Sequence, residues 1–480
     1  MASRGLGIDA LRTGQREAVE GALEGRDVLA VMPTGYGKSA IYQLVAAAVD
    51  GPTVVVSPLI ALQRDQVEAL AGEAVGEAAQ ANSTLRPSER DAAFGRLRDG
   101  RLEFLFLAPE QLAKDDTVAA LAEAGVSLFV VDEAHCISSW GHDFRPDYLR
   151  LGDVIDGLGH PTVIALTATA APPVRKEIAD RLHLRDPKVV VHGFDRPNIH
   201  LAVEVFPDGA EKDARLLNQT LVLAAGGRSG IVYVTTRRRT EELAELLSRE
   251  GPRAEAYHGG LPRRRREEVQ EGFMDGDVRI VVATTAFGMG IDKADVRFVL
   301  HGDVTESIDE YYQEIGRAGR DGEPAEACLF FHASDLGLRR FLGSTATVDE
   351  DDLVDVATAV AQAGDGGVPV DRLAEDLALN PRGLTMALHR LEDAGAVALN
   401  GDDVARPAAG APEPEAAARR ALDIEDDRKQ LEASRFEMMR AYAETRGCRR
   451  RFLLTYFGER YDGDCGFCDN CESGASAAAH

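Results

Sequence analysis

A glycine-rich segment near the N-terminus has the residue types that bind phosphate. The segment VMPTGYGKSA (31–40) follows an apolar run and precedes a helical pattern. Glycines let backbone N–H groups approach phosphate oxygens at the start of a helix. We expect Lys38 to reach the β- and γ-phosphates of a nucleotide and Ser39 to ligand Mg²⁺. The strict G-x-x-x-x-G-K-[ST] pattern fails at Met32, but T-G-x-G-K-S is intact; a glycine-rich turn with a surface lysine is the alternative.

An adjacent pair of acids follows another apolar run, in VVDEAHC (130–136). At the end of a strand, Asp132 would hold Mg²⁺ and Glu133 would polarise the attacking water. Such a pair is commonplace and is usually only solvated. Its position after a phosphate-binding loop in an α/β sheet favours the catalytic interpretation.

Two arginines in YYQEIGRAGRDG (311–322) form a third chemical feature. Arg317 and Arg320 are three residues apart, so a helix would place them on one face. We expect them to reach across a cleft to the triphosphate, where an arginine raises the rate by about 10³–10⁵-fold. A surface arginine pair is the alternative. Together the three features predict a nucleotide hydrolase whose site is assembled from two domains.

Four of the six cysteines cluster near the C-terminus, as Cys448-x16-Cys465-x2-Cys468-x2-Cys471. Four thiolates suit tetrahedral Zn²⁺ and leave no ligand position open, which predicts a structural site. An iron–sulfur cluster is the alternative. We expect the remaining two, Cys136 and Cys328, to be ordinary buried thiols.

The elements that must position these residues are indicated by apolar runs that alternate with amphipathic stretches. This alternation is typical of a doubly wound parallel sheet. The rhythm breaks near FDRPNIH (194–200) and then restarts, so we expect an α/β fold of two tandem domains, 1–200 and 201–335, with a cleft between them. The runs expected to be strands are 28–33, 53–58, 102–109, 128–133 and 162–169, then 230–236, 253–260, 279–285, 296–302 and 327–332.

The pattern changes after residue 335. Helical patterns at 351–364, 371–379 and 381–397, followed by a hairpin with its turn at Asn400-Gly401, suggest a winged-helix-like module over 336–408. We expect a linker and a long helix over 409–445, a helical zinc-binding module over 446–474, and a disordered tail over 475–480.

Composition limits the class of protein. The chain has 480 residues, 45% of them hydrophobic, and no run approaches the ~18 apolar residues of a membrane helix. Its start lacks an apolar secretory core. These facts argue against membrane, secreted, fibrous and disordered classes and predict a cytoplasmic multidomain protein. The net charge of −26 disfavours a nonspecific nucleic-acid binder but leaves room for a locally basic channel.

The chain resembles the RecQ family of DNA helicases, of the DExH type of superfamily 2. The resemblance covers about 1–335 and returns at 446–471. It is carried, in order, by RTGQ (12–15), VVVSPLIALQRDQV (54–67), APEQL (108–112), DEAHCISSWGHDFRPDY (132–148), ALTATA (165–170), FDRPNI (194–199), YHGGL (257–261), VVATTAFGMGIDK (281–293) and QEIGRAGRDG (313–322).

The resemblance implies two RecA-like domains and roles for individual residues. Gln15 would read adenine by its amide, although Leu11 stands where the family usually has an aromatic residue. His135 would link the nucleotide site to the DNA-sensing parts, and Thr167 and Thr169 would couple hydrolysis to domain motion. The implied nucleotide-binding set is Arg12, Gln15, Thr34, Gly35, Tyr36, Gly37, Lys38 and Ser39.

DNA contacts are implied mainly by the loop CISSWGHDFRPDY (136–148). Trp140, Phe144 and Arg145 are planar groups that could stack on splayed bases or hold a phosphate; packing in a domain core is the alternative. Ser57 matches a segment that contacts the strand backbone. Arg237–Arg239 falls where the family contacts DNA, Arg263–Arg266 suggests a solvated helix face, and Arg449–Arg451 would either touch phosphates or be solvated.

The sequence also departs from the family. We expect a short form of the family without the usual C-terminal winged helix and helical domain. A winged-helix-like segment instead precedes the zinc module. Its third helix offers Arg382, His389 and Arg390 beside Glu392 and Asp393. A major-groove reader is normally basic, so both DNA contact and a packing or protein-docking role stay open.

The expected function is that of an ATP- and Mg²⁺-dependent 3′–5′ DNA helicase with structural Zn²⁺, acting in recombination and repair. Expected partners are single-stranded and partially duplex DNA, with a single-strand-binding or other repair protein as a further candidate and no membrane. We expect a cytoplasmic, nucleoid-associated monomer. The alternatives are an RNA helicase, a DNA-stimulated translocase that does not unwind efficiently, and an ATP-switched regulatory DNA-binding protein.

Overall fold

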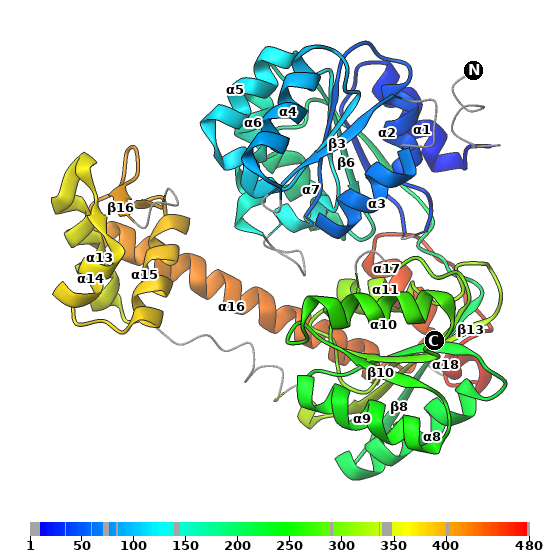
Figure 1. Cartoon of the computed structure of the whole chain (residues 1–480). Coiled ribbons are helices and arrows are strands. Elements are labelled where there is room, and N and C mark those ends of the chain that lie inside the picture. The colour runs from blue at the N-terminus through cyan, green and yellow to red at the C-terminus, as the bar shows by residue number, and fades with distance from the viewer. Residues whose placement is uncertain are drawn as a thin grey trace. The chain divides into compact units, whose positions relative to one another are not determined.

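The chain divides into two compact units in the computed structural model (Figure 1). One unit comprises Met1–Asp335 and Met438–His480, and the other comprises Leu336–Glu437. The structure describes residues 10–33, 35–58, 60–70, 76–82, 85–138, 145–288, 291–335, 337, 348–399 and 404–477.

The first lobe of the larger unit is built on a seven-stranded parallel sheet of order β3-β4-β2-β5-β6-β1-β7. All four residues of β1 have no exposed surface, so both faces of this strand are covered, as in a doubly wound sheet. The strands are β1 (Val28–Val31), β2 (Thr53–Val56), β3 (Ala78–Ala81), β4 (Phe104–Leu107), β5 (Leu128–Val131), β6 (Thr162–Thr167) and β7 (Lys188–Val191). The helices are α1 (Thr13–Leu23), α2 (Ser39–Ala46), α3 (Ile60–Leu70), α4 (Pro87–Arg98), α5 (Asp115–Ala124), α6 (Leu151–Gly157) and α7 (Pro172–Arg181).

The second lobe has a six-stranded parallel sheet of order β10-β11-β9-β12-β13-β8. Its strands are β8 (Ile199–Phe206), β9 (Ser229–Tyr233), β10 (Ala254–Tyr257), β11 (Ile280–Ala283), β12 (Val296–His301) and β13 (Ala325–His332). Its helices are α8 (Gly209–Ala224), α9 (Arg237–Glu250), α10 (Arg263–Asp275) and α11 (Ile308–Ile315). The two sheets confirm the prediction of tandem doubly wound domains.

Three strands lie outside the runs from which the sheets were predicted. β3 is AAQA, which has little β-propensity, and β7 (KVVV) is a short edge strand. β8 (IHLAVEVF) alternates between buried and partly exposed residues, which is a strand pattern, but it begins within the segment 194–200 that was interpreted as a break between domains. That alternation suits an edge strand with one face covered, and β8 lies at the edge of the sheet, where it pairs with β13.

In its described residues, the smaller unit contains three helices ahead of the long helix α16 and a three-stranded antiparallel sheet of order β14-β16-β15. Its helices are α13 (Glu350–Ala363), α14 (Val370–Asp376) and α15 (Pro381–Asp393), and its strands are β14 (Val368–Pro369), β15 (Val397–Leu399) and β16 (Val404–Pro407). Leu353, Leu384 and Leu391 lie at its core. These elements match the winged-helix-like expectation; the predicted turn at Asn400-Gly401 lies outside the described residues.

A long helix, α16 (Pro414–Glu444), leads from the smaller unit toward the cysteines. It is followed by α17 (Arg449–Tyr456) and α18 (Asp469–Glu472), which pack with the second lobe as part of the larger unit. Within the tail that was expected to be disordered, the Ser476 N–H donates to Asn470 O at 3.0 Å and Ser476 is only 2% exposed, so the description of residues 475–477 departs from that expectation. Across the described residues, no helix combines the length and apolar character needed to span a bilayer.

Candidate functional site

The glycine-rich loop lies at the carboxyl end of β1 and leads directly into α2. Gly35 and Gly37 have φ angles of +78° and +85°, which residues with a Cβ rarely adopt. The Lys38 ammonium donates to Met32 O at 3.3 Å, across the loop. The loop therefore has the conformation and the cation that triphosphate binding requires. Thr34 lies outside the described residues.

The start of α1 closes this loop from the other side. The Gln15 side-chain amide donates to Tyr36 O at 2.8 Å and to Gly37 O at 2.9 Å, and its Oε1 accepts from the Arg12 N–H at 2.9 Å. The Arg12 guanidinium lies 4.8 Å from the Tyr36 ring centroid and donates to Gly35 O at 3.4 Å. Both amide protons of Gln15 are donated to loop carbonyls, so the amide would have to break one of these bonds to donate to adenine. The recognition of adenine by Gln15 stays a prediction.

The acidic pair follows β5, next to the loop in the same sheet edge. Burial and the Glu133 carboxylate raise the pKa of Asp132 to about 7, while Lys38 acts in the opposite direction. A bound Mg²⁺ would favour the ionised carboxylate, so the environment fits a cation ligand. Burial, and secondarily Asp132, also raises the pKa of Tyr42 above its usual value. Gln66 joins Tyr42 to Ser39, through bonds of 3.0 and 3.4 Å.

Glu133 occupies a strained backbone position. Its φ of +48° is in the left-handed region, which costs a non-glycine residue about 1–3 kcal/mol. Its Oε2 is buried without a hydrogen bond to any described residue and lies 3.4 Å from His135 Nδ1. A buried carboxylate oxygen that makes no hydrogen bond to a described residue is suited to accept from a water molecule, which is the predicted role.

The predicted coupling residues are in contact with this acid. His135 Nδ1 lies 2.8 Å from Thr167 Oγ1 at the end of β6. The Thr167 hydroxyl donates to Thr169 O at 2.9 Å, and Thr169 N–H lies 3.3 Å from the same hydroxyl. His135, Thr167 and Thr169 are each at most 1% exposed. A continuous buried chain thus runs from Glu133 to the loop after β6.

The two arginines after α11 differ in their surroundings. Arg317 donates to Gly288 O within its own lobe. Arg320 pairs with Asp292 Oδ1 at 2.6 Å through Nη1, but its Nε and Nη2 are buried without a hydrogen-bond acceptor among the described residues. A Cβ added at Gly35 would lie 3.5 Å from Arg320 Cδ, so the Arg320 side chain lies against the glycine-rich loop. Burial lowers the pKa of Arg320, yet a guanidinium stays charged.

The predicted DNA-contacting residues are described only in part. Trp140 and Phe144 lie outside the described residues. Arg145 donates to Pro58 O at 3.1 Å, and its N–H donates to Cys136 O at 2.9 Å. Ser57 is 2% exposed and its carbonyl accepts from Gln63 at 2.9 Å. Arg145 therefore links the segments after β2 and β5, and the DNA roles of all four residues stay predictions.

The four clustered cysteines converge. Their sulfur atoms all lie within 4.8 Å of one another, with Cys465–Cys471 at 3.8 Å and Cys468–Cys471 at 3.3 Å. Tetrahedral zinc at a Zn–S distance of about 2.3 Å separates its sulfur ligands by about 3.8 Å. The N–H groups of Arg451 and Cys465 approach Cys448 Sγ at 3.5 and 3.3 Å, as suits a thiolate. The donor set fits a structural zinc ion.

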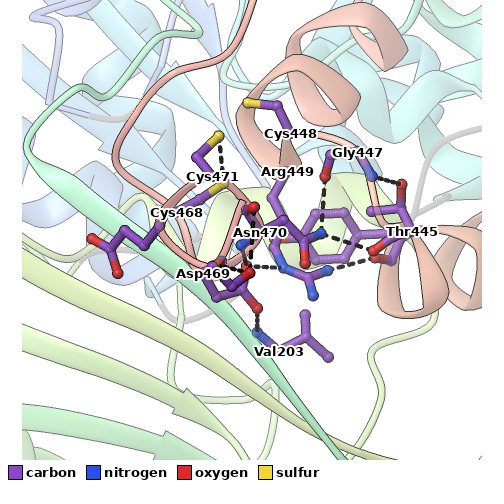
Figure 2. Close-up of polar contacts among 12 residues, drawn as sticks. Val203, Thr445, Gly447, Cys448, Arg449, Cys468, Asp469, Asn470 and Cys471 are labelled. Carbon is purple, nitrogen blue, oxygen red and sulfur yellow. Dashed lines mark hydrogen bonds and ion pairs between the residues drawn. The ribbon is translucent and has the colours of Figure 1, made fainter. Parts of the chain in front are cut away.

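The cysteine module is fixed to the edge of the second sheet (Figure 2). Arg449 Nε donates to Asp469 Oδ1 at 2.6 Å, and Asp469 Oδ2 accepts the Val203 N–H of β8 at 3.0 Å. Asn470 donates to Thr445 O and Gly447 O at 2.8 and 2.9 Å, which ties the end of α16 to α18. Leu201 and Cys468 also form an isolated parallel bridge, so the module covers part of the open edge of β8.

Two of the three consecutive arginines in this module were misassigned. Arg449 and Arg450 are 3% and 5% exposed. Arg450 donates to Ile199 O at 2.8 Å and pairs with Asp195 at 3.4 Å. Both are structural, because their partners are brought to them by the fold. The side chains of Arg263 and Arg264, by contrast, are 72% and 91% exposed, as expected of a solvated helix face.

The third helix of the smaller unit offers less to DNA than its sequence suggested. Arg390 pairs with Glu425 of α16 at 3.1 Å, and the two side chains are 10% and 4% exposed. His389 is exposed, 3.5 Å from Glu392. The side chain of Arg382 lies outside the described residues. Arg390 thus joins α15 to α16, which favours the packing role.

Comparisons with known proteins agree with this arrangement. The sequence model of the DEAD/DEAH box helicase family matches residues 12–178, that of the helicase conserved C-terminal domain matches 211–322, and that of RecQ zinc-binding matches 416–472. Among solved structures, Mycobacterium smegmatis helicase Lhr bound to ssDNA and AMP-PNP aligns with a TM-score of 0.55 at 23% identity, covering 88% of this chain and 61% of that chain. Helicase MrfA bound to DNA aligns with a TM-score of 0.59 at 19% identity, covering 86% of this chain and 62% of that chain. These two likenesses show the fold, including its tandem RecA-like domains.

Curated relatives give the family. The chain is 36% identical over 467 residues to the ATP-dependent DNA helicase RecQ of Pasteurella multocida, which covers 97% of this chain and 61% of the relative. It thus spans about three fifths of that relative's length. It is 35% identical over 475 residues to the probable ATP-dependent DNA helicase RecS of Bacillus subtilis, which covers 97% of this chain and 90% of the relative. The chain belongs to the RecQ family of DNA helicases.

Proposed function

We propose that this chain is a Mg²⁺- and ATP-dependent DNA helicase that moves 3′ to 5′ on single-stranded DNA and unwinds duplexes in recombination and repair. The observation that carries the proposal is the position of Arg320, whose buried and partly unpartnered guanidinium lies against the glycine-rich loop. This contact supports the proposal, because a cation from the second lobe then lies beside the loop to which a triphosphate would bind in the first.

The residues divide the chemistry as follows. The loop N–H groups and Lys38 bind the β- and γ-phosphates, and Ser39 and Asp132 are the residues that would hold Mg²⁺, which neutralises phosphate charge. Glu133 orients and polarises the attacking water through its unpartnered oxygen. Arg320 stabilises the charge that develops on the transferred phosphoryl group.

Hydrolysis then has a route to the parts that hold DNA. Loss of the γ-phosphate changes what Glu133 contacts, and His135 carries that change to Thr167 and Thr169. Trp140, Phe144, Arg145 and Ser57 are the proposed DNA contacts. A protein that binds DNA in this way would act at the nucleoid, in the cytoplasm.

The test is DNA-stimulated ATP hydrolysis by the full chain, measured with single-stranded DNA, with RNA of the same sequence and without nucleic acid. We expect stimulation by DNA, and loss of turnover by at least 10³-fold in Glu133→Gln. Arg215→Ala is the matched control, because Arg215 of α8 pairs with Glu204 of β8 at 2.7 Å, within the second lobe. Stimulation by RNA alone would refute the DNA assignment, and full turnover in Glu133→Gln would refute the catalytic one.

A second candidate, a DNA-stimulated translocase that does not separate strands, is favoured by one observation. Arg390 is bonded to Glu425 rather than available to a duplex. ATP hydrolysis that is stimulated by DNA without strand displacement would select this candidate.

A further inference from the structure

The segment that connects the two sheets contacts the turn after α11 that carries Arg317 and Arg320, called here the arginine-bearing turn. This connector runs from the end of β7 to the start of β8 and includes Arg196. The Arg196 guanidinium donates to three carbonyls in the turn after α11, to Gly316 O at 2.9 Å, Ala318 O at 2.8 Å and Gly319 O at 3.1 Å. We propose that Arg196 is a positioning residue for Arg320, an inference that rests on the proposed role of Arg320 in ATP hydrolysis.

The position of these three carbonyls explains how the Arg196 side chain can orient Arg320. They flank Arg317 and directly precede Arg320, so the guanidinium fixes the backbone on both sides of the first arginine and up to the second. The last carbonyls of a helix have no partner within it and attract a cation. Arg196 supplies that cation with the planar, two-pronged geometry that a lysine lacks.

The turn after α11 is held by further close contacts with the connector. Asn198, also in the connector, donates to Gly319 O at 2.8 Å and to Glu323 O at 2.9 Å. Gly319 has a φ of +56°, and a Cβ added there would lie 2.4 Å from the Asn198 side-chain nitrogen. The connector thus holds the turn at both its start and its end.

The zinc module supports the connector from another side. The Phe457 ring stacks on the Phe194 ring with centroids 4.5 Å apart and planes at 4°. Arg450 donates to Ile199 O and pairs with Asp195. Tyr312 of α11 donates its hydroxyl to Phe194 O. The connector is therefore in contact with both the arginine-bearing element and the zinc module, which together hold it in place.

The experiment is a double-mutant cycle on single-turnover hydrolysis of radiolabelled ATP, with saturating single-stranded DNA. The variants are Arg196→Ala, Arg320→Ala, the pair together, and Arg215→Ala as the control, since Arg215 pairs with Glu204 of β8 at 2.7 Å. A displacement of about 1 Å at a catalytic group can cost about 10²-fold in rate. We expect Arg196→Ala to lower the rate constant for hydrolysis by 10- to 100-fold, with ATP affinity changed less than threefold.

The cycle separates positioning from general damage. If Arg196 acts through Arg320, the loss caused by Arg196→Ala vanishes in the Arg320→Ala background. Equal loss in both backgrounds, or a loss confined to ATP affinity, would overturn the proposal. If Arg196→Ala does not fold, Arg196→Lys, which keeps the charge, replaces it in the cycle. We expect Arg196→Lys to lower the rate constant for hydrolysis at least threefold, and to have no such effect in the Arg320→Ala background. Wild-type protein without hydrolysis would overturn the proposed function itself, whereas full activity in Arg320→Ala would overturn only the role of that arginine and the inference built on it.

Discussion

Removing the Asp469 carboxylate tests whether the zinc module depends on its attachment to β8. Asp469→Ala deletes the acceptor of Arg449 Nε at 2.6 Å and the acceptor of the Val203 N–H at 3.0 Å. The Arg449 side chain is 4% exposed, so the substitution would leave a buried cation without its carboxylate. The hydrogen bond from Arg449 to Tyr442 O would remain.

The expected cost follows from these two losses. Removing one partner of a buried ion pair costs about 3–5 kcal/mol, and an orphaned buried N–H adds about 1–3 kcal/mol. Because the Asp469 side chain is 27% exposed, water screens part of the charge term, and we expect about 3 kcal/mol in total. Since zinc binds only the folded module, this loss lowers apparent zinc affinity by about 10²-fold.

The assay is competition for zinc against a chelator of known affinity, with circular dichroism to follow the rest of the chain. Glu472→Gln is the matched control, because Glu472 pairs with His200 at 3.2 Å through a side chain that is 53% exposed, and such pairs are worth about 0–1 kcal/mol. An Asp469→Ala protein that holds zinc as tightly as the wild type would refute this reasoning.

Three further outcomes are expected. Gly319→Ala should lower the melting temperature and slow ATP hydrolysis, because its φ of +56° and the 2.4 Å approach to Asn198 leave no room for a methyl group; unchanged values in both assays would contradict the tight turn. Arg390→Ala should destabilise the smaller unit by about 2 kcal/mol in denaturant unfolding, because the buried Glu425 carboxylate loses one ion-pair partner and keeps Arg428 at 2.8 Å, yet leave DNA affinity within twofold; a large loss of affinity would show that α15 reads DNA. DNA affinity measured by fluorescence anisotropy should fall steeply as salt rises, since phosphate contacts dominate binding and the chain carries a net charge of −26; a flat salt profile would argue against them.

Local signals predicted the parts of the site that are continuous in sequence. The glycine-rich loop lies between β1 and α2, the acidic pair ends β5, and the four cysteines converge, all as their spacing indicated. Each of these depends on a backbone geometry or a donor set encoded within a few residues. The starts of α14 and α15 also follow from Pro369 and Pro381. The helix predicted over 381–397, however, ends at Asp393, and β15 begins at Val397.

Contacts between distant segments could not be predicted in this way. Arg449 and Arg450 look like surface cations until Asp469, Ile199 and Asp195 are brought beside them. Arg196 was part of a recognised motif, but its bonds to carbonyls more than a hundred residues away have no local signature. Only the arrangement of the strands and the connector brings these groups together.

The most direct test of the central proposal is strand displacement from partial duplexes that carry either a 3′ or a 5′ single-stranded tail, with ATP hydrolysis followed in the same samples. We expect ATP-dependent release from the 3′-tailed duplex, none from the 5′-tailed one, and none with a non-hydrolysable analogue. Release from the 5′-tailed duplex alone would contradict the direction of movement, and hydrolysis without release from either would contradict the helicase assignment in favour of a translocase.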